Sequence, residues 1–422
     1  MLQQGNTLDL ENLCGNDRLV KIFCDLVSFD TKSDPLSKNV PSSVGQLRLG
    51  ASLVSEIRTL GFECTQDKNG VVITKVPASS GYENAIRICL LAHLDTAPDA
   101  SGKDVLPHLV KDYKGEGIEL KNGLIIDDKL CKELKNHIGE DIIVTDGTTL
   151  LGADDKAGVA VLLNLLYKLK TTDIPHGALT IVFTVDEEIG YSADYVDLDV
   201  VDCDYGVTID GSECGEFDVE TFNASLAKVE FTGISVHTAV AYKKLVNAVT
   251  LACEFNMMLP LNERPENTRD HEGFYHLHDI NGSTEYAVAW INLRDFEKDG
   301  LKKREEVVLN CAKLINQKLG YDAVKVTIKE QYVNLMSYLQ ENRLILDLCK
   351  EAFADANVEV KEHSVRGGTD GSNLSARGLP TPNIFTGALN CHGPYECLPV
   401  QSLHKAYDIV ECIVKRAANK LR

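Results

Sequence analysis

The sequence predicts an α/β fold, in which a doubly wound larger domain is interrupted by a smaller ferredoxin-like α+β domain. Helix-like segments alternate with short apolar runs in the first half of the chain, and the order of elements changes from about Ala224. Helices placed between buried strands are typical of a doubly wound sheet. At about 100–200 residues per domain, a chain of 422 residues has room for two or three domains.

The elements of the larger domain are predicted from apolar runs and from helical periodicity. Nearly continuous apolar runs predict strands that are buried on both faces, at 85–92, 178–185 and 205–209, and a further strand at 70–76. Apolar residues that recur at helical spacing predict helices at 17–29, 46–60 and 155–169. The pattern resumes near the C-terminus with helices at 341–356 and 402–417 and a strand at 382–386.

The smaller domain is predicted from the order of the elements between residues 224 and 333. A strand (226–233) and a helix (243–258) precede two strands (273–280 and 285–293), a charged helix (301–319) and a last strand (323–330). The order β-α-β-β-α-β is that of the ferredoxin-like split unit. The predicted division is therefore a discontinuous domain at 1–223 and 334–422, with an inserted domain at 224–333.

Composition and charge exclude several function classes. The chain has 43 Lys+Arg against 63 Asp+Glu, and a net charge of −20 would repel a nucleic-acid backbone. No apolar run reaches 18 residues and the N-terminus does not resemble a signal peptide, so we expect no membrane span. The thirteen cysteines include no Cys-x-x-Cys pair, so we expect reduced, buried thiols and a cytosolic protein.

Acidic and imidazole residues directly follow three of the predicted strands. His93-Leu94-Asp95 follows the first strand, Asp186-Glu187-Glu188 the second and Asp210-Gly211 the third. Any one of these motifs alone is better interpreted as an acidic surface loop. Because the carboxyl ends of strands in open α/β sheets form the ligand crevice, their joint placement favours one common site.

Further candidates lie around this predicted crevice. His93 and Asp95 are two residues apart and can face the same side of a strand, where a carboxylate can orient an imidazole that binds zinc. Asp154 and Asp155 precede an apolar helix, and a helix N-cap needs only one of them. His392 lies in a Gly/Pro loop after an apolar strand, and it is a candidate only if the site needs a second imidazole.

Seven motifs, which contain all of these residues except His392, together resemble the peptidase T family of the dinuclear zinc exopeptidase superfamily. The motifs are HLDTAPDASGK (93–103), TDGTTLLGADDKAG (145–158), IPHGALTIVFTVDEEIG (174–190), TIDGSECGE (208–216), EGFYHL (272–277), LRDFE (293–297) and VRGGTDGSNLS (365–375). The resemblance covers about residues 17–420. It implies a tripeptide aminopeptidase that binds two Zn²⁺ ions per subunit, with Co²⁺ or Mn²⁺ as substitutes.

The resemblance also implies a role for each polar residue of the crevice. His93, Asp154 and Asp210 resemble the ligands of the first zinc ion. Asp154, Glu188 and His392 resemble the ligands of the second, so that Asp154 bridges the two ions. Glu187 resembles the general base, and Asp95 resembles the residue that orients His93. In the family the peptide bond after the bridging aspartate is cis, so a cis bond is expected at Asp154–Asp155.

Four residues are candidates for binding the substrate. His237 and Asn247 correspond to a histidine and an asparagine that contact substrate in the superfamily, and Arg294 and Arg366 are candidates for pairing with a peptide carboxylate. A structural ion pair is an equally good interpretation of each arginine. The chain departs from the family pattern after His237, where His-Thr-Ala-Val-Ala replaces His-Pro-Gly-Thr-Ala, and at Pro394 and Tyr395. About sixteen N-terminal residues extend beyond the family's usual start and are expected to form a loose tail.

Three functions agree with these observations. The first is a dizinc peptidase that releases the N-terminal residue of tripeptides. The second is a related zinc hydrolase acting on dipeptides or N-acyl amino acids, and the third is a catalytically silent binding protein on the same fold. All five expected ligands, the base Glu187 and the orienting residue Asp95 are present, which weighs against the third. The expected partners are a short peptide and a second copy in a homodimer, because the inserted domain often mediates dimers in the superfamily that the chain resembles.

Overall fold

The computed structural model describes residues 17–422, and the predicted N-terminal tail lies outside the described residues. The chain forms two compact units. The larger comprises Met1–Val219, Leu339–His363 and Arg377–Arg422, and the smaller comprises Glu220–Tyr338 and Ser364–Ala376. The predicted domain division stays a prediction, but the segment 364–376 groups differently from it. Thr221 and Ser372 are hydrogen-bonded through their side chains, which ties this segment to the smaller unit.

The larger unit is built on an eight-stranded mixed sheet with the strand order β1-β2-β8-β3-β9-β16-β10-β15. The four central strands are parallel, namely β8 (Leu179–Thr184), β3 (Ile88–His93), β9 (Tyr205–Gly211) and β16 (Asn383–Phe385). The other strands are β1 (Glu63–Gln66), β2 (Val72–Val76), β10 (Glu216–Thr221) and β15 (Lys361–Val365). The central strands match the apolar runs, because every residue of β3 and β8 is buried.

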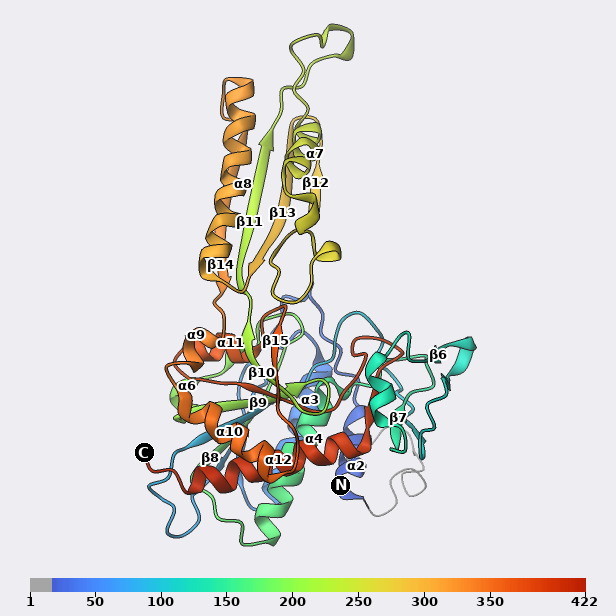
Figure 1. Cartoon of the computed structure of the whole chain (residues 1–422), viewed down its shortest axis with the longest axis vertical. Helices are drawn as coiled ribbons and strands as arrows, with labels where there is room; N and C mark the ends of the chain where they lie inside the picture. The colour runs from blue at the N-terminus through green and yellow to red at the C-terminus, as the bar shows by residue number, and fades with distance from the viewer. Residues whose placement is uncertain (1–16) are drawn as a thin grey trace. The chain divides into compact units, whose positions relative to one another are not determined.

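Helices cover this sheet, as the predicted fold class requires. The long helices are α2 (Arg18–Val27), α3 (Val44–Thr59), α4 (Ala153–Thr171), α10 (Arg343–Asp355) and α12 (Val400–Ala418). Helix α4 packs against β3 and β9, and α10 and α12 lie side by side (Figure 1). Short helical segments complete the unit: α5 (Ser192–Tyr195), α6 (Leu198–Val201), η1 (Lys121–Gly123) and η2 (Lys132–His137). The short helix α11 (Asp370–Ala376) falls in the smaller unit.

The start of α4 approaches strand β9 closely because Gly158 has no side chain. A Cβ atom at this position would lie 2.1 Å from the backbone oxygen of Ile209 and 2.4 Å from Asp155 Oδ1. Any other residue would therefore push the helix away from the sheet. The glycine keeps the first turn of α4 against the strand that carries Asp210.

A smaller layer of the larger unit was not predicted from the sequence. A three-stranded sheet has the order β17-β7-β4, and a hairpin joins β5 to β6. The bounds are β4 (His108–Val110), β5 (Ile118–Glu119), β6 (Ile125–Ile126), β7 (Ile142–Val144) and β17 (Cys397–Pro399). These elements share a small apolar cluster that includes Cys131, Leu134 and Leu389. Because β17 pairs with β7, the C-terminal loop is tied to a segment some 250 residues earlier in the chain.

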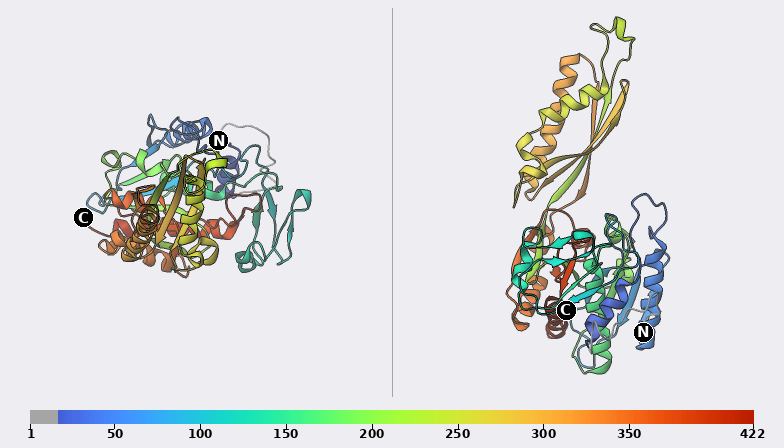
Figure 2. Two further views of the ribbon diagram at one scale, coloured as in Figure 1. Left: turned by 90° about the horizontal axis from the view of Figure 1, so that it is seen from above. Right: turned by 90° about the vertical axis from the view of Figure 1, so that its right-hand side faces the viewer.

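The smaller unit has the predicted element order and a four-stranded antiparallel sheet in the order β12-β13-β11-β14. Its main elements are β11 (Asn223–Thr232), α7 (Ala248–Met258), β12 (Phe274–Gly282), β13 (Tyr286–Asp295), α8 (Lys298–Leu319) and β14 (Val324–Tyr332). Short helices at η3 (Thr238–Val240), η4 (Leu261–Glu263), η5 (Pro265–Asn267) and α9 (Met336–Leu339) connect them. Figure 2 (right) shows α7 and α8 on the same face of the sheet, where the unit's apolar core lies.

One predicted boundary in the smaller unit is wrong. The helix expected at 243–258 begins at Ala248, because the side chain of Asn247 accepts hydrogen bonds from the backbone N–H groups of Val249 and Thr250. An asparagine that caps in this way sets the first turn of a helix.

Within residues 17–422, no helix is long and apolar enough to cross a membrane. The twelve described cysteines are all free.

Candidate metal centre

Four parallel strands deliver polar residues to one edge of the central sheet. Strand β3 ends at His93, β8 leads into the turn of Glu187 and Glu188, and β9 carries Asp210 near its end. Strand β16 is parallel to β9, so the loop that follows it leaves from the same edge and carries His392. The sequence predicted the positions of the polar residues after β3, β8 and β9 from the apolar runs of these strands. The strand before His392 was also predicted, and the structure adds its parallel pairing with β9, which explains why His392 lies at the same edge.

The carboxylate of Asp154 lies between the two imidazoles. Its Oδ1 is 3.0 Å from His93 Nε2, and its Oδ2 is 3.2 Å from His392 Nε2. The two histidines are about 300 residues apart in the sequence, yet each faces a different oxygen of the same carboxylate. One carboxylate is therefore shared by the two imidazoles, and the role of Asp154 as a ligand of two metal ions stays a prediction.

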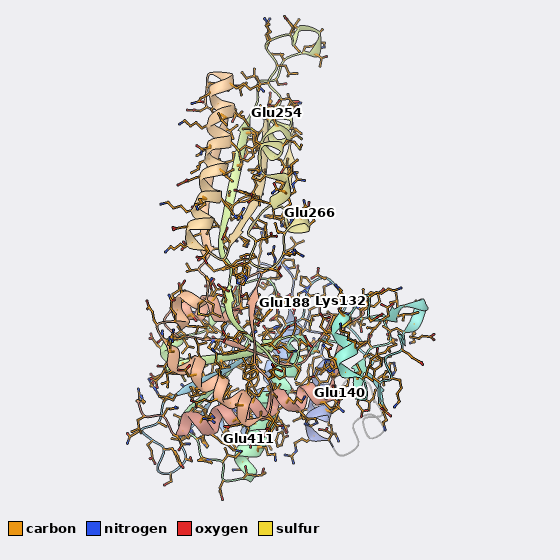
Figure 3. The ribbon with its side chains drawn as sticks, in the orientation of Figure 1. Lys132, Glu140, Glu188, Glu254, Glu266 and Glu411 are labelled. Atoms are coloured by element: carbon orange, nitrogen blue, oxygen red, sulfur yellow. The ribbon has the colours of Figure 1, made fainter. Side chains whose placement is uncertain are left out.

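Two more carboxylates complete the two sets. Asp210 Oδ1 lies 3.3 Å from His93 Nε2, and Glu188 Oε2 lies 3.1 Å from His392 Nε2. Figure 3 labels Glu188 among the side chains of the larger unit. All five residues proposed as ligands thus come together, as His93–Asp154–Asp210 and Asp154–Glu188–His392. Both sets lie entirely within the larger unit.

The paired aspartates at the start of α4 have different surroundings. Asp155 is fully buried, and its carboxylate accepts hydrogen bonds from the backbone N–H groups of His93 and Gly158. It therefore caps the helix and fastens it to β3, which leaves Asp154 to face the imidazoles. The peptide bond between the two residues is cis, as the family resemblance implied.

A buried carboxylate holds the turn that contains Glu187 and Glu188. Asp95 is fully buried, and its two oxygens accept the backbone N–H groups of Glu187 at 3.0 Å and Glu188 at 3.1 Å. His93 Nδ1 lies 3.1 Å from the backbone oxygen of Asp95 and 3.5 Å from its Oδ1. Asp95 therefore contacts both His93 and the proposed base, which gives it a wider positioning role than the sequence suggested.

The residue before this turn is fastened from the other side. The buried carboxylate of Asp186 accepts hydrogen bonds from the backbone N–H and hydroxyl of Ser42 and from the side-chain amide of Gln46. The side chain of Gln46 in return accepts the backbone N–H of Asp186. The sequence did not predict this contact. Gln46 and Asp186 are 140 residues apart, and no sequence motif links them. The turn is thus held by Asp95 and Asp186 together.

The crowding of carboxylates shifts the pKa values of the cluster. Burial raises the pKa of Asp210 to about 8 and also raises the pKa of Glu188. Hydrogen bonds to Asp154 and Glu188 raise the pKa of His392 to about 11. Burial would raise the pKa of Asp154, but hydrogen bonds from the two imidazoles outweigh burial and lower it. The cluster is therefore a buried region of negative potential, which favours bound cations.

A divalent metal such as zinc fits the donor set. Zinc binds imidazole nitrogen and carboxylate oxygen, and four ligands about 2.0–2.1 Å from a tetrahedral ion are about 3.3 Å apart. The nitrogen-to-oxygen distances within the two sets are 3.0–3.3 Å. In addition, Glu188 Oε1 is buried and has no hydrogen-bond partner among the described residues, so it is an acceptor that a cation would satisfy.

A geometric grouping of ligand atoms also includes the proposed base. His93, Asp154 and Glu188 each place one ligand atom within 4.8 Å of the others, and so do His93, Glu187 and Asp210. Glu187 is therefore close enough to the cluster to act on a group bound there. The zinc content of a Glu187 variant distinguishes a base, whose loss leaves zinc bound, from a ligand, whose loss releases it.

Two of the residues proposed for substrate binding, His237 and Asn247, lie in the smaller unit. The ring nitrogen Nδ1 of His237 accepts the backbone N–H of Ala239, so the turn after this histidine forms although the family's Pro-Gly is absent. Asn247 uses its side-chain oxygen as the N-cap of α7 and keeps its amide N–H₂ for other partners. Their contact with substrate stays a proposal.

The two arginines of the smaller unit differ in their partners. Arg366 donates hydrogen bonds to the backbone oxygens of Asp270 and Glu272 and to the hydroxyl of Thr268, and it stacks on Phe222. These contacts are structural, but none of them is the ion pair that the sequence suggested. Arg294 donates through Nη1 to the backbone oxygens of Ser225 and Leu293, contacts the side chain of Tyr332, and forms no ion pair with a described carboxylate. It is the better candidate for an anionic group of the substrate.

Sequence reasoning also missed Glu396. This glutamate is 1% exposed and accepts the backbone N–H groups of Leu151, Gly152 and Asp154 at 2.7, 2.8 and 3.1 Å. Gly152 has a φ of 79°, a conformation that favours glycine, and it turns the chain around the carboxylate. The sequence feature that could have indicated Glu396 is its position: an acidic residue four residues after His392 and directly before the apolar segment Cys-Leu-Pro-Val.

Comparisons with known proteins agree on one family. Residues 146–416 match the model of peptidase family M20/M25/M40. Peptidase T from Clostridium perfringens is 42% identical over 399 residues, which are 94% of this chain and 98% of the relative. Peptidase T from Clostridium acetobutylicum is 38% identical over 408 residues, which are 96% of this chain and 100% of the relative.

Solved structures show the same fold. The crystal structure of aminopeptidase PepT from Bacillus cereus has a TM-score of 0.75 and 23% identity, covering 95% of this chain and 98% of that one. A protein from Bacillus subtilis described as a dinuclear metal-binding peptidase of the M20 family has a TM-score of 0.65 and 13% identity, covering 96% and 98%. With its full-length sequence relatives, the chain belongs to peptidase family M20/M25/M40 and, within that family, to the peptidase T group.

Proposed function

We propose that this chain is a dizinc aminopeptidase that releases the N-terminal residue of short peptides, chiefly tripeptides. The observation that carries the proposal is the position of Asp154, whose two oxygens each face a different imidazole. Each imidazole also faces a second carboxylate, that of Asp210 or of Glu188. The names of the full-length relatives supply the peptide substrate, because they are peptidase T proteins. The dinuclear metal centre described for the Bacillus subtilis neighbour supports the metal count.

The proposed ligands are His93, Asp154 and Asp210 for one zinc ion and Asp154, Glu188 and His392 for the other. When bound, zinc polarises the scissile carbonyl and lowers the pKa of water to about 7. Glu187 accepts the proton of the attacking water and passes it to the leaving amine. The backbone N–H of Glu187 is held by Asp95 Oδ1, so the base is kept in place for both transfers.

Substrate recognition is proposed for the smaller unit. Partial burial lowers the pKa of the Arg294 guanidinium, which contacts the face of Tyr332 rather than an acid. A peptide's terminal carboxylate would supply the missing anion through a bidentate pair. His237 and Asn247 are proposed to contact the scissile group, and Arg366 is the weakest of the four because its donors are already used. Dimer formation and a cytosolic location remain predictions from the sequence.

The substrate class is tested with a matched panel of peptides. We expect the purified protein to hydrolyse a free tripeptide faster than the dipeptide or tetrapeptide of related sequence, and to leave the N-acetylated tripeptide intact. Amino-acid release is measured chromatographically, with and without a chelator. Preferred cleavage of the dipeptide or of the N-acylated compound would support the related hydrolase instead. No turnover of any member after zinc loading would support the silent binding protein.

A further inference from the structure

Glu396 joins two of the three chain segments that supply the second proposed ligand set, those of Asp154 and His392. It lies four residues after His392 in a loop that is closed by backbone hydrogen bonds between Leu389 and Cys397. Its side chain reaches the segment that begins α4, where it accepts three backbone N–H groups, one of them from Asp154. One buried carboxylate therefore fixes the loop of His392 relative to the backbone of Asp154.

The bonding of Glu396 is unusual for a buried carboxylate, because backbone N–H groups are its hydrogen-bond partners. It forms no ion pair within the described part of the chain, and the nearby ammonium of Lys156 donates instead to the backbone oxygen of Phe29. Burial raises the pKa of Glu396 to about 7, and the hydrogen bonds from the three N–H groups oppose this shift because they favour the ionised carboxylate. The three N–H groups converge because Gly152 adopts its left-handed conformation between them.

The two oxygens of Glu396 are used differently. Oε2 accepts Leu151 and Gly152, whereas Oε1 accepts Asp154 alone, at 3.1 Å. The bond to Asp154 is the one that bears on the metal centre. It holds the backbone of the residue whose carboxylate lies 3.2 Å from His392 Nε2.

We propose that Glu396 is a positioning residue for the metal centre, which sets the distance between Asp154 and His392 and thereby the affinity of the second metal ion. This inference rests on the proposed dizinc function. Groups that orient metal ligands from outside the coordination sphere typically change metal affinity about 10- to 100-fold when they are replaced. Glu396 belongs to neither proposed ligand set, so its effect is exerted through Asp154 and His392.

The variant Glu396→Gln tests the proposal, because its amide has the size of the carboxylate but only one acceptor oxygen. That oxygen satisfies Leu151 and Gly152, and the N–H₂ group then opposes the N–H of Asp154. We expect the dissociation constant of the second zinc site, formed by Asp154, Glu188 and His392, to rise about 10- to 100-fold. Zinc affinity is measured by competition with a chromophoric chelator, on the full-length protein.

The matched control is Asp67→Asn, in the turn between β1 and β2. Asp67 also accepts two backbone N–H groups, from Asn69 and Val71, both at 2.9 Å, and it lies outside the proposed centre. We expect this variant to keep both zinc affinities. Thermal unfolding of all proteins after zinc removal shows whether either substitution destabilises the metal-free fold, which a purely structural role of Glu396 would require.

Two results would overturn the proposal. The first is wild-type zinc affinity in Glu396→Gln, and the second is a loss of affinity at both sites that only parallels a loss of metal-free stability. If Glu396→Gln does not fold, Glu396→Asp replaces it: its shorter carboxylate must weaken the second site, and unchanged affinity again refutes the proposal. A wild-type protein that binds no zinc would refute the proposed function itself, which separates the two failures.

Discussion

Replacing Glu187 with alanine is expected to lower tripeptide turnover about 10²–10⁴-fold, the usual contribution of a general base. The reason is that Asp95 accepts the backbone N–H of Glu187 and so holds this residue beside the two ligand sets. Among the described residues outside those sets, no other glutamate or aspartate is held there by Asp95. Zinc content should remain at the wild-type value, because Glu188 and not Glu187 faces His392. Turnover is measured with saturating tripeptide, and zinc by elemental analysis of the same samples.

The zinc measurement separates two roles for Glu187. Its carboxylate also lies within 4.8 Å of ligand atoms of His93 and Asp210, so geometry alone leaves it eligible as a ligand. Loss of zinc in Glu187→Ala would assign it to the metal, and near-normal turnover would remove it from catalysis altogether. Glu187→Gln is the size-matched control, since it cannot accept the proton but fills the same space.

Replacing Asp154 with alanine should remove both zinc ions and all peptide hydrolysis. Each of its oxygens faces a different histidine, so each ligand set loses a member at once. The matched variant is His392→Ala, which removes a ligand from one set only and should leave about one zinc ion per chain. Both proteins are desalted against chelator-free buffer, and their zinc content is measured.

These two variants have opposite diagnostic outcomes. Asp154→Ala with one zinc ion retained would contradict the bridging role of the aspartate. If His392→Ala retains both ions, His392 is not a metal ligand. Another side chain near Glu188 would then have to bind the second ion. Since His392 is more exposed than the buried His93, its replacement should disturb the fold less.

Much of the site could be predicted from the sequence, because buried parallel strands are recognisable as apolar runs. Ile88–His93 and Leu179–Thr184 are buried at every residue, so the polar residues that follow them had to lie at a sheet edge. A helix cap needs only one of the two aspartates at 154–155, so the sequence indicated a different role for the other. The structure assigns the cap to Asp155.

What the sequence did not predict depends on long-range pairing. Strands β4, β5 and β6 have only two or three residues, too few for an alternating pattern to be recognised. His392 was expected at the site only through the family resemblance, since no local pattern shows that β16 runs parallel to β9. Glu396 contacts backbone groups more than 240 residues away, and backbone partners leave no trace in residue identity.

The most direct test of the account is a zinc titration of the chelator-stripped protein, with bound zinc and tripeptide hydrolysis followed in the same samples. The account predicts no hydrolysis without metal and a maximum at two equivalents of zinc per chain. Full hydrolysis by the stripped protein, or a maximum at a single equivalent with no further binding, would contradict it.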